Sequence, residues 1–256
     1  MSDSVRNIAA IAGKELRSYF ASPVAWVIMA LFALIFGYFF RVMLEFYLME
    51  SMRSQFGASG NVNERVVRPL LSNASVLILF LLPMLTMRAY AEEKRSGTIE
   101  LLLTSPLRDF EIVLGKFLGA MGMFAALLAV AVVYVSLLFF YGNPEWRPIF
   151  TGFVGLLLMG GCFIALGLFL SSMTKNQTVA GAATFVIALL FWIIDWSADT
   201  TPGTWGEVLR HLSITQHFED FAKGVIDTKH LIYYLSFISF GLFLTMRSVD
   251  TDRWRG

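Results

Sequence analysis

Three histidines, His211, His217 and His230, are the side chains of this sequence that most invite a metal-binding hypothesis. Their spacing matches no ligand pattern that is typical of metal sites, and histidines are common where a chain meets an interface. Cys162 is the single cysteine and lies within an apolar run, which excludes a disulfide framework and a cysteine metal site. We therefore predict that the chain has no metal site.

A second group of polar side chains lies in the stretch "AEEKRSGTIELLLTSPL", residues 91–107, between two long apolar runs. Gly97 is expected to end a first helical part, and Thr98 could cap a short second helix that Pro106 ends. A short helix that carries apolar residues beside charges suits a surface that another protein binds. An ordinary charged loop is the alternative, and the spacing alone favours it. The residues predicted to make the contact are Glu92, Glu93, Lys94, Gly97, Thr98, Glu100, Leu101, Leu102, Leu103 and Pro106.

The composition indicates what kind of molecule must position these residues. Hydrophobic residues make up 57% of the 256 residues and charged residues 15%, and the mean hydropathy is +0.66. Because so few polar side chains could not cover a soluble surface, we predict an all-α integral membrane protein that forms a single domain over residues 1–256. The net charge of +1 gives no reason to expect a nucleic-acid partner.

Six stretches are long and apolar enough to cross a bilayer, whose hydrocarbon core needs about 20 such residues per helix. The predicted spans are residues 24–40, 70–90, 117–141, 149–170, 178–196 and 230–247. An even number of spans places both termini on one side. A modest majority of the 20 lysines and arginines falls on that side, which favours cytoplasmic termini.

The residues before the first span form an amphipathic pattern. Apolar residues from Ile8 to Phe20 recur at helical spacing, with Lys14 and Arg17 on the opposite face, which is typical of a helix that lies in the membrane interface. A solvated leader that only anchors the chain is the equal alternative. Ser22 and Pro23 fit an N-cap and a first helical position, so the chain can turn sharply into the first span.

Between the last two spans, residues 197–229 are predicted to form an outer helical loop. Its apolar stripe predicts one short helix that includes Val225 and Ile226, and Asp227 or Thr228 could cap the final span after it. The members of the stripe are Phe218, Phe221, Ala222, Val225 and Ile226.

Several functions are disfavoured by residue types that the spans lack. No predicted span carries Asp, Glu, Lys, Arg or His near its middle, which argues against a proton-coupled transporter and against a hydrolase that acts inside the membrane. The sequence also has no GxxxxGK[ST] phosphate loop. We therefore expect no cofactor in this chain, and any ATP hydrolysis, with the ATP and Mg²⁺ that it needs, would have to take place in a partner. In the spans themselves, Gly160, Gly161 and Gly167 allow close helix contact.

The stretch "MRAYAEEKRSGTIELLLTSPLRDFEIVLGKFLGA", residues 87–120, resembles the signature of ABC type-2 permeases. The likeness is greatest to the subgroup typified by the gliding-motility permease GldF and, more distantly, to NosY. It continues through "KELRSYFASPVAWV", "LGLFLSSMTKNQTVA" and "HFEDFAKGVIDTKHLIYYLS", and so covers nearly the whole chain in order. The resemblance implies an elbow helix (1–22), six spans, a coupling helix in the first cytoplasmic loop (92–110) and short re-entrant outer helices.

Carried onto this sequence, the family's cytoplasmic motif falls on the polar residues of the coupling loop named above, with Lys116 opening the next span. The elbow motif falls on Lys14, Glu15, Arg17 and Pro23. The resemblance implies mechanical and not catalytic roles. Glu92 and Glu93 would place charge at the ATPase surface, and the leucines would fill its groove.

The resemblance also implies the partners and the function. We expect two separate ATPase subunits, a second permease copy, membrane lipid and a possible periplasmic or auxiliary envelope protein, all at the bacterial inner membrane. The chain would be a permease subunit and not an enzyme, and it would couple ATP hydrolysis to export or mechanical work. The alternative is a non-transporting anchor that couples an ATPase to a cell-envelope assembly.

Overall fold

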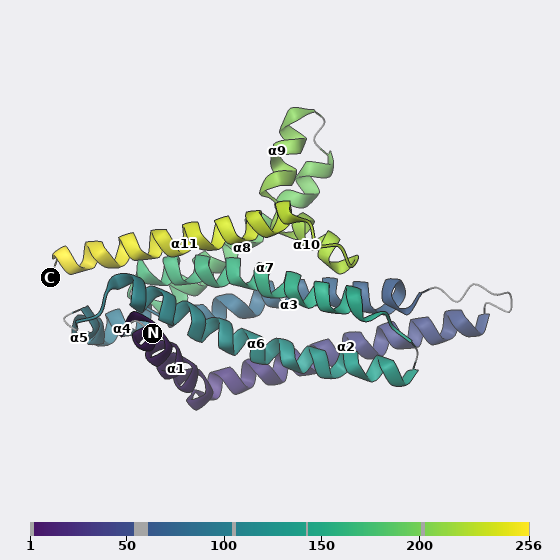
Figure 1. Ribbon diagram of the computed structural model, residues 1–256, viewed down its shortest axis with the longest axis horizontal. Coiled ribbons are helices and arrows are strands. Elements are labelled where there is room, and N and C mark those ends of the chain that lie inside the picture. Colours follow the sequence, from purple (N-terminus) through teal and green to yellow (C-terminus); the bar gives the residue numbers. More distant parts are fainter. Residues whose placement is uncertain (1–2, 54–60, 104–105, 142, 201–202, 256) are drawn as a thin grey trace.

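The computed structural model describes residues 3–53, 61–103, 106–141, 143–200 and 203–255, and for some of these, Leu101 to Leu103 among them, it describes only the backbone. Within these residues the chain forms helices and no strands, as predicted (Figure 1). The elements are α1 (Asp3–Ala21), α2 (Pro23–Arg53), the π-helix η1 (Asn63–Val67), α3 (Arg68–Thr86), α4 (Ala91–Ser96), α5 (Thr98–Leu103), α6 (Asp109–Tyr141), α7 (Trp146–Ser172), α8 (Gln177–Thr200), α9 (Thr204–Leu212), α10 (Ile214–Ala222) and α11 (Thr228–Arg255).

Six helical stretches of the described chain are long and apolar enough to cross a membrane, which confirms the predicted number. They are Pro23–Met52, Asn63–Ser96, Asp109–Phe140, Trp146–Ser172, Gln177–Ile194 and Thr228–Thr251. The helix of the first span, α2, continues to Arg53, well beyond residue 40, where the span was expected to end. Arg41 Nε donates to Glu45 Oε1 at 2.8 Å, one helical turn later, and such a pair stabilises a helix beyond its apolar part.

The helix α7 lies at the centre of the bundle and contacts α3, α6, α8, α10 and α11. Its glycines make these contacts close, as predicted. A Cβ atom on Gly160 would overlap the ring of Phe124 in α6, and one on Gly167 would overlap Thr86 in α3. A Cβ on Gly161 would lie 2.8 Å from Ile238 Cδ1 in α11.

The N-terminal helix α1 packs along the first turns of α6 and is no solvated leader. Gly115 and Gly119, one helical turn apart on α6, give the room for this contact. A Cβ on Gly115 would lie 2.6 Å from Ile11 Cβ, and a Cβ on Gly119 would lie 2.6 Å from Glu15 Cβ. Because α1 meets α6 so closely, a movement of one helix must involve the other.

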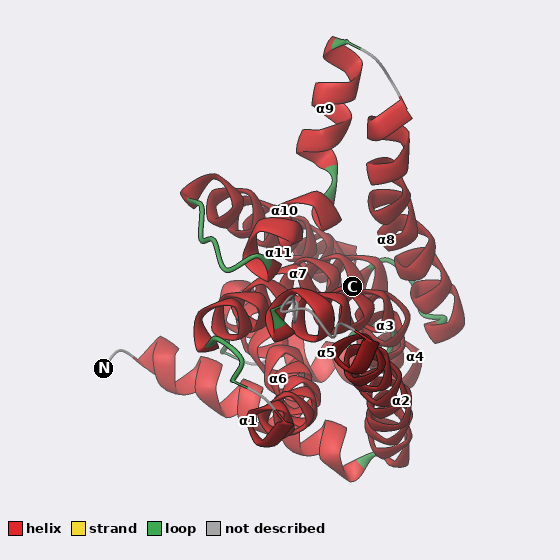
Figure 2. Cartoon of the chain, turned by 90° about the vertical axis from the view of Figure 1, so that its right-hand side faces the viewer, coloured by secondary structure: helices red, strands yellow, loops and turns green. Residues whose placement is uncertain are grey.

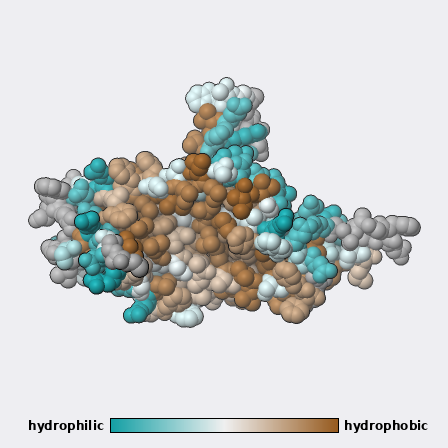
Figure 3. All heavy atoms as spheres, in the orientation of Figure 1, coloured by the Kyte–Doolittle hydropathy of each residue, from teal (hydrophilic) through white to brown (hydrophobic). Residues whose placement is uncertain are grey.

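Polar groups gather at the two ends of the bundle. Figure 3 shows hydrophobic residues over the middle of the visible face and hydrophilic ones towards its ends. Both termini lie at the same end as α4 and α5 (Figure 1). The helix α9 stands off the bundle beside the last turns of α8 (Figure 2).

The short helix predicted from the apolar stripe is α10, but it is shorter than expected. It ends at Ala222, and Val225 and Ile226 lie outside it, 54% and 48% exposed. Gly224 adopts φ +92°, a left-handed conformation, while Val225 N bonds back to Asp220 O at 2.9 Å. This turn ends the helix before the stripe is complete. Asp227 precedes α11 and accepts a hydrogen bond from Lys229 N at 3.0 Å, which agrees with its predicted capping role.

Candidate functional site

The segment that leaves α3 towards α6 consists of a turn and two short helices, α4 and α5. Gly97 lies between them with φ +73°, which a glycine adopts without strain, so it ends α4 as predicted. Thr98 does not precede α5 as a cap but is its first residue. Its hydroxyl lies 2.9 Å from Ser96 Oγ, and Ser96 in turn donates to Glu92 O at 2.9 Å.

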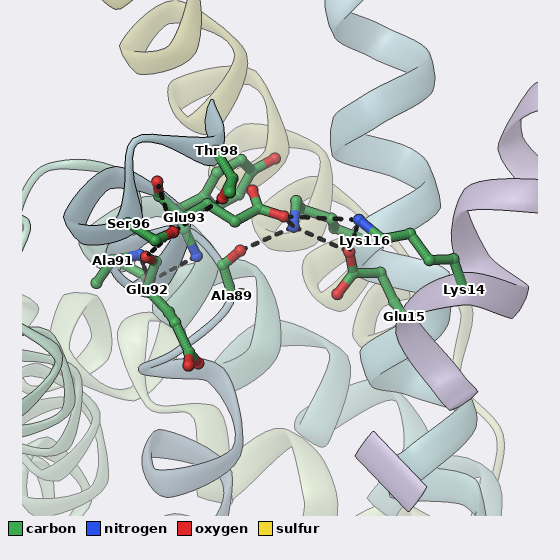
Figure 4. Close-up of polar contacts among 11 residues, drawn as sticks. Lys14, Glu15, Ala89, Ala91, Glu92, Glu93, Ser96, Thr98 and Lys116 are labelled. Carbon is green, nitrogen blue, oxygen red and sulfur yellow. Dashed lines mark hydrogen bonds and ion pairs between the residues drawn. The ribbon is translucent and has the colours of Figure 1, made fainter. Parts of the chain in front are cut away.

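Lys116 of α6 is the centre of this region, although its side chain is only 2% exposed. Its ammonium group donates to Glu93 Oε1 at 2.8 Å, to Ala89 O at 2.8 Å and to Glu15 Oε1 at 3.0 Å (Figure 4). It also lies 5.0 Å from the centre of the Tyr90 ring. One charged group therefore joins α1, the end of α3, α4 and α6. We call Lys116, Glu15 and Glu93 the buried triad.

The triad is fully bonded at its cation, which explains how a buried charge is tolerated. An ammonium group has three N–H donors, and the three oxygen atoms use all of them. A buried charge costs several kcal/mol in lost hydration unless it is paired and hydrogen-bonded, and removal of one partner typically costs about 3–5 kcal/mol. The triad is thus a specific connection between helices.

A second set of hydrogen bonds fixes the start of α4 to α7. Ser171 Oγ accepts hydrogen bonds from Tyr90 N and Ala91 N, both at 3.1 Å, and donates to Met87 O at 3.0 Å. Lys94 Nζ donates to Ser172 O, a carbonyl that Ser248 Oγ of α11 also reaches at 3.3 Å. The segment is therefore attached directly to three of the surrounding helices, α1, α6 and α7, and the same carbonyl of α7 also holds α11.

The predicted contact residues divide into two groups in the structure. Glu93 points inward to the triad, and Lys94 points inward to α7. The carboxylate of Glu93 was expected at the surface but does not lie there. The exposed residues are Glu92, Gly97, Thr98, Glu100 and Pro106. Ile99 is 9% exposed and packs against the core. The backbone of Leu101, Leu102 and Leu103 forms part of α5, but their side chains lie outside the described part of the structure.

The elbow residues also have distinct positions. Glu15 belongs to the triad, and Lys14 lies at 3.9 Å from Glu15 and 4.0 Å from Glu93 with its side chain 66% exposed. Arg17 is exposed. Pro23 begins α2, as predicted. Ser22 accepts a hydrogen bond from Ala25 N through its carbonyl, while its hydroxyl accepts one from Arg88 Nη1 at 3.4 Å.

Sequence reasoning singled out Glu15 and Glu93 but not their common partner. Lys116 was expected only to open the third span, and Ser171 was not singled out at all. A lysine within the first turns of an otherwise apolar helix was the available signal for Lys116, because such a charge requires partners. No comparable signal existed for Ser171, since serines at helix ends are ordinary.

Two of the three histidines, His217 and His230, belong to a packed polar cluster at the other end of the bundle. The rings of His217 and His230 lie 4.9 Å apart, and His230 Nε2 lies 2.8 Å from Asp220 Oδ2. Burial lowers the pKa of His217 from 6.5 to about 4, and the hydrogen bond from His230 lowers the pKa of Asp220. In the part of the chain that the structure describes, no three His, Cys, Asp or Glu side chains converge as metal ligands would.

Comparisons with known proteins agree with the helical arrangement. A family model described as "ABC-2 family transporter protein" matches residues 9–244. The chain is 31% identical over 166 residues to "Probable ABC transporter permease protein NosY" of Pseudomonas aeruginosa, which covers 59% of this chain and 60% of that protein. It is 23% identical over 142 residues to "Probable multidrug ABC transporter permease YbhR" of Escherichia coli, which covers 55% of this chain and 38% of that protein. The matched region thus spans less than two thirds of each relative.

Proposed function

The chain belongs to the ABC-2 transporter family as a permease, and from this premise we propose that it is the membrane half of an ATP-driven transporter of the bacterial inner membrane. ATP hydrolysis takes place in a separate ATPase subunit, which binds Mg²⁺ and ATP. The permease converts that hydrolysis into export or mechanical work. The termini and the end that carries α4 and α5 face the cytoplasm and the ATPase.

The observation that carries the proposal is the buried triad. A short helix pair that only closed a loop would need no attachment to the spans. Here α4 is bonded through Glu93 to Lys116 of α6, and through that lysine to Glu15 of α1. A push on α4 and α5 is therefore transmitted to two further helices, because the ammonium group cannot leave its partners without a large cost in free energy.

The assembly that we propose contains two ATPase copies and a second permease copy. The helices α2 and α8 suit the contact between permeases because large apolar side chains are exposed on both, with Leu34 at 71% and Leu190 at 57%. Gly181 of α8 packs against Met87 of the same chain and so is not free for this contact. A GldF-like subgroup and an auxiliary envelope protein are part of the same proposal, and both rest on the resemblance alone.

A test of the proposal uses the chain together with its ATPase in sealed vesicles. We expect that the isolated chain hydrolyses no ATP, that it co-purifies with a cassette ATPase, and that the complex moves a substrate when ATP is added. Robust hydrolysis by the isolated chain would contradict the proposal that a separate subunit hydrolyses ATP. Hydrolysis by the complex without flux of any substrate would favour the alternative, a non-transporting anchor for an envelope assembly.

A further inference from the structure

A cavity of about 280 Å³ lies between α1, the start of α2, the end of α3 and α4. Its lining divides into a polar and an apolar part. Val24, Ala25 and Ile28 of α2 and Met84 and Leu85 of α3 form the apolar part. The polar part is formed by the elbow and by α4, next to the buried triad. A cavity that is half polar and half apolar, at the end of a membrane-spanning bundle, has the character of a site for an amphiphile.

Two cations, Lys14 and Arg88, line this cavity, and the hydrogen-bonding capacity of Arg88 is largely unused. Its Nη1 donates to Ser22 Oγ at the long distance of 3.4 Å. Its Nε is buried and has no hydrogen-bond partner among the described residues. The ion pairs of the described chain include none that involves Arg88. A half-buried guanidinium group that lacks an anion is a typical place for a phosphate, which it can bind through two parallel hydrogen bonds.

The anions of the same cavity have unused capacity as well. Glu93 bonds to Lys116 through Oε1, but its Oε2 is buried and without a partner among the described residues. Glu92 also lines the cavity, is exposed, and points away from Lys116 (Figure 4). These oxygen atoms need N–H or O–H donors, which a ligand could provide.

We propose that this cavity binds the headgroup of one phospholipid of the ethanolamine class from the adjacent membrane leaflet. Arg88, with the hydroxyl of Ser22, binds the phosphate. Glu92 and the free oxygen of Glu93 bind the primary ammonium group. The apolar part of the cavity covers the glycerol and the first acyl carbons.

The charges around the cavity favour a zwitterionic headgroup over an anionic one. Lys14 and Arg88 line it together with Glu15, Glu92 and Glu93, and the adjacent Lys116 makes three cations against three carboxylates. An anionic headgroup would therefore meet no excess of positive charge. A choline headgroup is also zwitterionic, but its quaternary nitrogen has no N–H group to donate to the carboxylates.

The apolar part decides between a membrane lipid and a soluble phosphate ester. A soluble ester would leave the side chains of Val24 and Met84, the latter 43% exposed, against water, whereas a lipid covers them and gains the free energy of their burial. The occupant is therefore a lipid, bound as part of the membrane and independent of the ATPase.

The test is a titration of the full, delipidated chain with three palmitoyl-oleoyl phospholipids, which carry ethanolamine, choline or glycerol headgroups, followed by native mass spectrometry. We expect the ethanolamine lipid to bind about tenfold more tightly than either of the others. Equal binding of ethanolamine and choline lipids, or preference for the glycerol lipid, would overturn the proposal. So would binding of soluble phosphoethanolamine as tight as that of the whole lipid.

Variants locate the binding within the cavity. Arg88→Gln should weaken retention of the ethanolamine lipid about tenfold, whereas Arg95→Gln, an exposed arginine of α4 outside the cavity, should leave it unchanged. Glu92→Gln should remove the preference for ethanolamine over choline, and Glu45→Gln on α2 is its matched control.

A further variant tests whether the lipid is lost because the cavity is blocked or because the protein is misfolded. Ser18 is exposed at the edge of the cavity, so Ser18→Phe should block it without removal of a charge. Loss of the lipid in Ser18→Phe, with the same monodisperse protein as wild type, supports the site. Undiminished binding in both Ser18→Phe and Arg88→Gln would show that the lipid binds elsewhere on the bundle.

Discussion

At the scale of single residues, Lys116 has the clearest structural role. The same residue type at the surface would contribute little, because exposed ion pairs are worth about 0–1 kcal/mol. At 2% exposure and with three oxygen partners, its charge instead holds α6 together with α1, α4 and the end of α3. The position of a lysine in the first turns of a membrane-spanning helix thus matters more than its contribution to the net charge.

We expect Lys116→Met to lower the free energy of unfolding by about 3–5 kcal/mol, because the carboxylates of Glu15 and Glu93 then lose their common cation. Thermal unfolding of the purified protein in detergent measures this. The matched control is Lys229→Met, a lysine whose side chain is 67% exposed beside Asp227, and here the change should stay below about 1 kcal/mol. Similar losses in the two variants would mean that the triad adds no specific stability.

At the scale of the elements, some boundaries could be predicted from the sequence and others could not. Gly97 and Pro23 mark their helix ends because their backbone preferences act locally. The continuation of α2 to Arg53 and the early end of α10 depend on Glu45 and on the turn at Gly224, which an apolar pattern does not reveal.

The candidate site was predicted as a segment but not as a set of contacts. Glu92 and Glu93 are neighbours in sequence, and spacing alone could not tell that the first is exposed and the second bonds to Lys116. That distinction depends on how α1 packs along α6, which brings Glu15 to the same point. Long-range packing of this kind has no local sequence signal.

His217 of α10 predicts how the stability of the protein depends on pH. Burial lowers the pKa of His217 to about 4 from 6.5, so between these values the unfolded ring binds a proton and the folded ring does not. Stability that is present above pH 6.5 should therefore fall as the pH is lowered towards 4, by about 2 kcal/mol, which is less than the full shift would give because water screens part of the charge. The lowered pKa of Asp220 adds a loss of stability mainly below pH 4, because the unfolded carboxyl titrates near 3.8.

Thermal unfolding measured at intervals from pH 7 to pH 4 tests this, with His217→Phe as the variant and His211→Phe, an exposed histidine of α9, as its matched control. The dependence on pH should shrink in His217→Phe and persist in His211→Phe. A dependence that is the same in wild type and in His217→Phe would assign it to other groups.

At the scale of the whole molecule, the large apolar side chains exposed on α2 indicate that the bundle has lipid or protein neighbours along this helix. A second permease copy at α2 predicts that Leu34→Cys, at a position 71% exposed, forms a covalent dimer under mild oxidation in the membrane. Cys162 is the single native cysteine and is buried, so it does not compete. Phe140→Cys on α6, 85% exposed, is the comparison position. Monomers alone at position 34, in a complex that still hydrolyses ATP, would exclude α2 from the contact.

The measurement that most directly tests the central claim, that α4 and α5 bind the ATPase, is co-purification of the ATPase with Leu102→Asp. A charge in an apolar contact worth about 1.5–3 kcal/mol per side chain should weaken the complex by one to two powers of ten. We expect Leu102→Asp to insert into the membrane in normal amounts but to lose the ATPase and its coupled hydrolysis. Val5→Asp, the same change at an exposed position of α1, should retain both. If Leu102→Asp inserts and still recruits an active, coupled ATPase, α4 and α5 are an ordinary loop and the account is wrong.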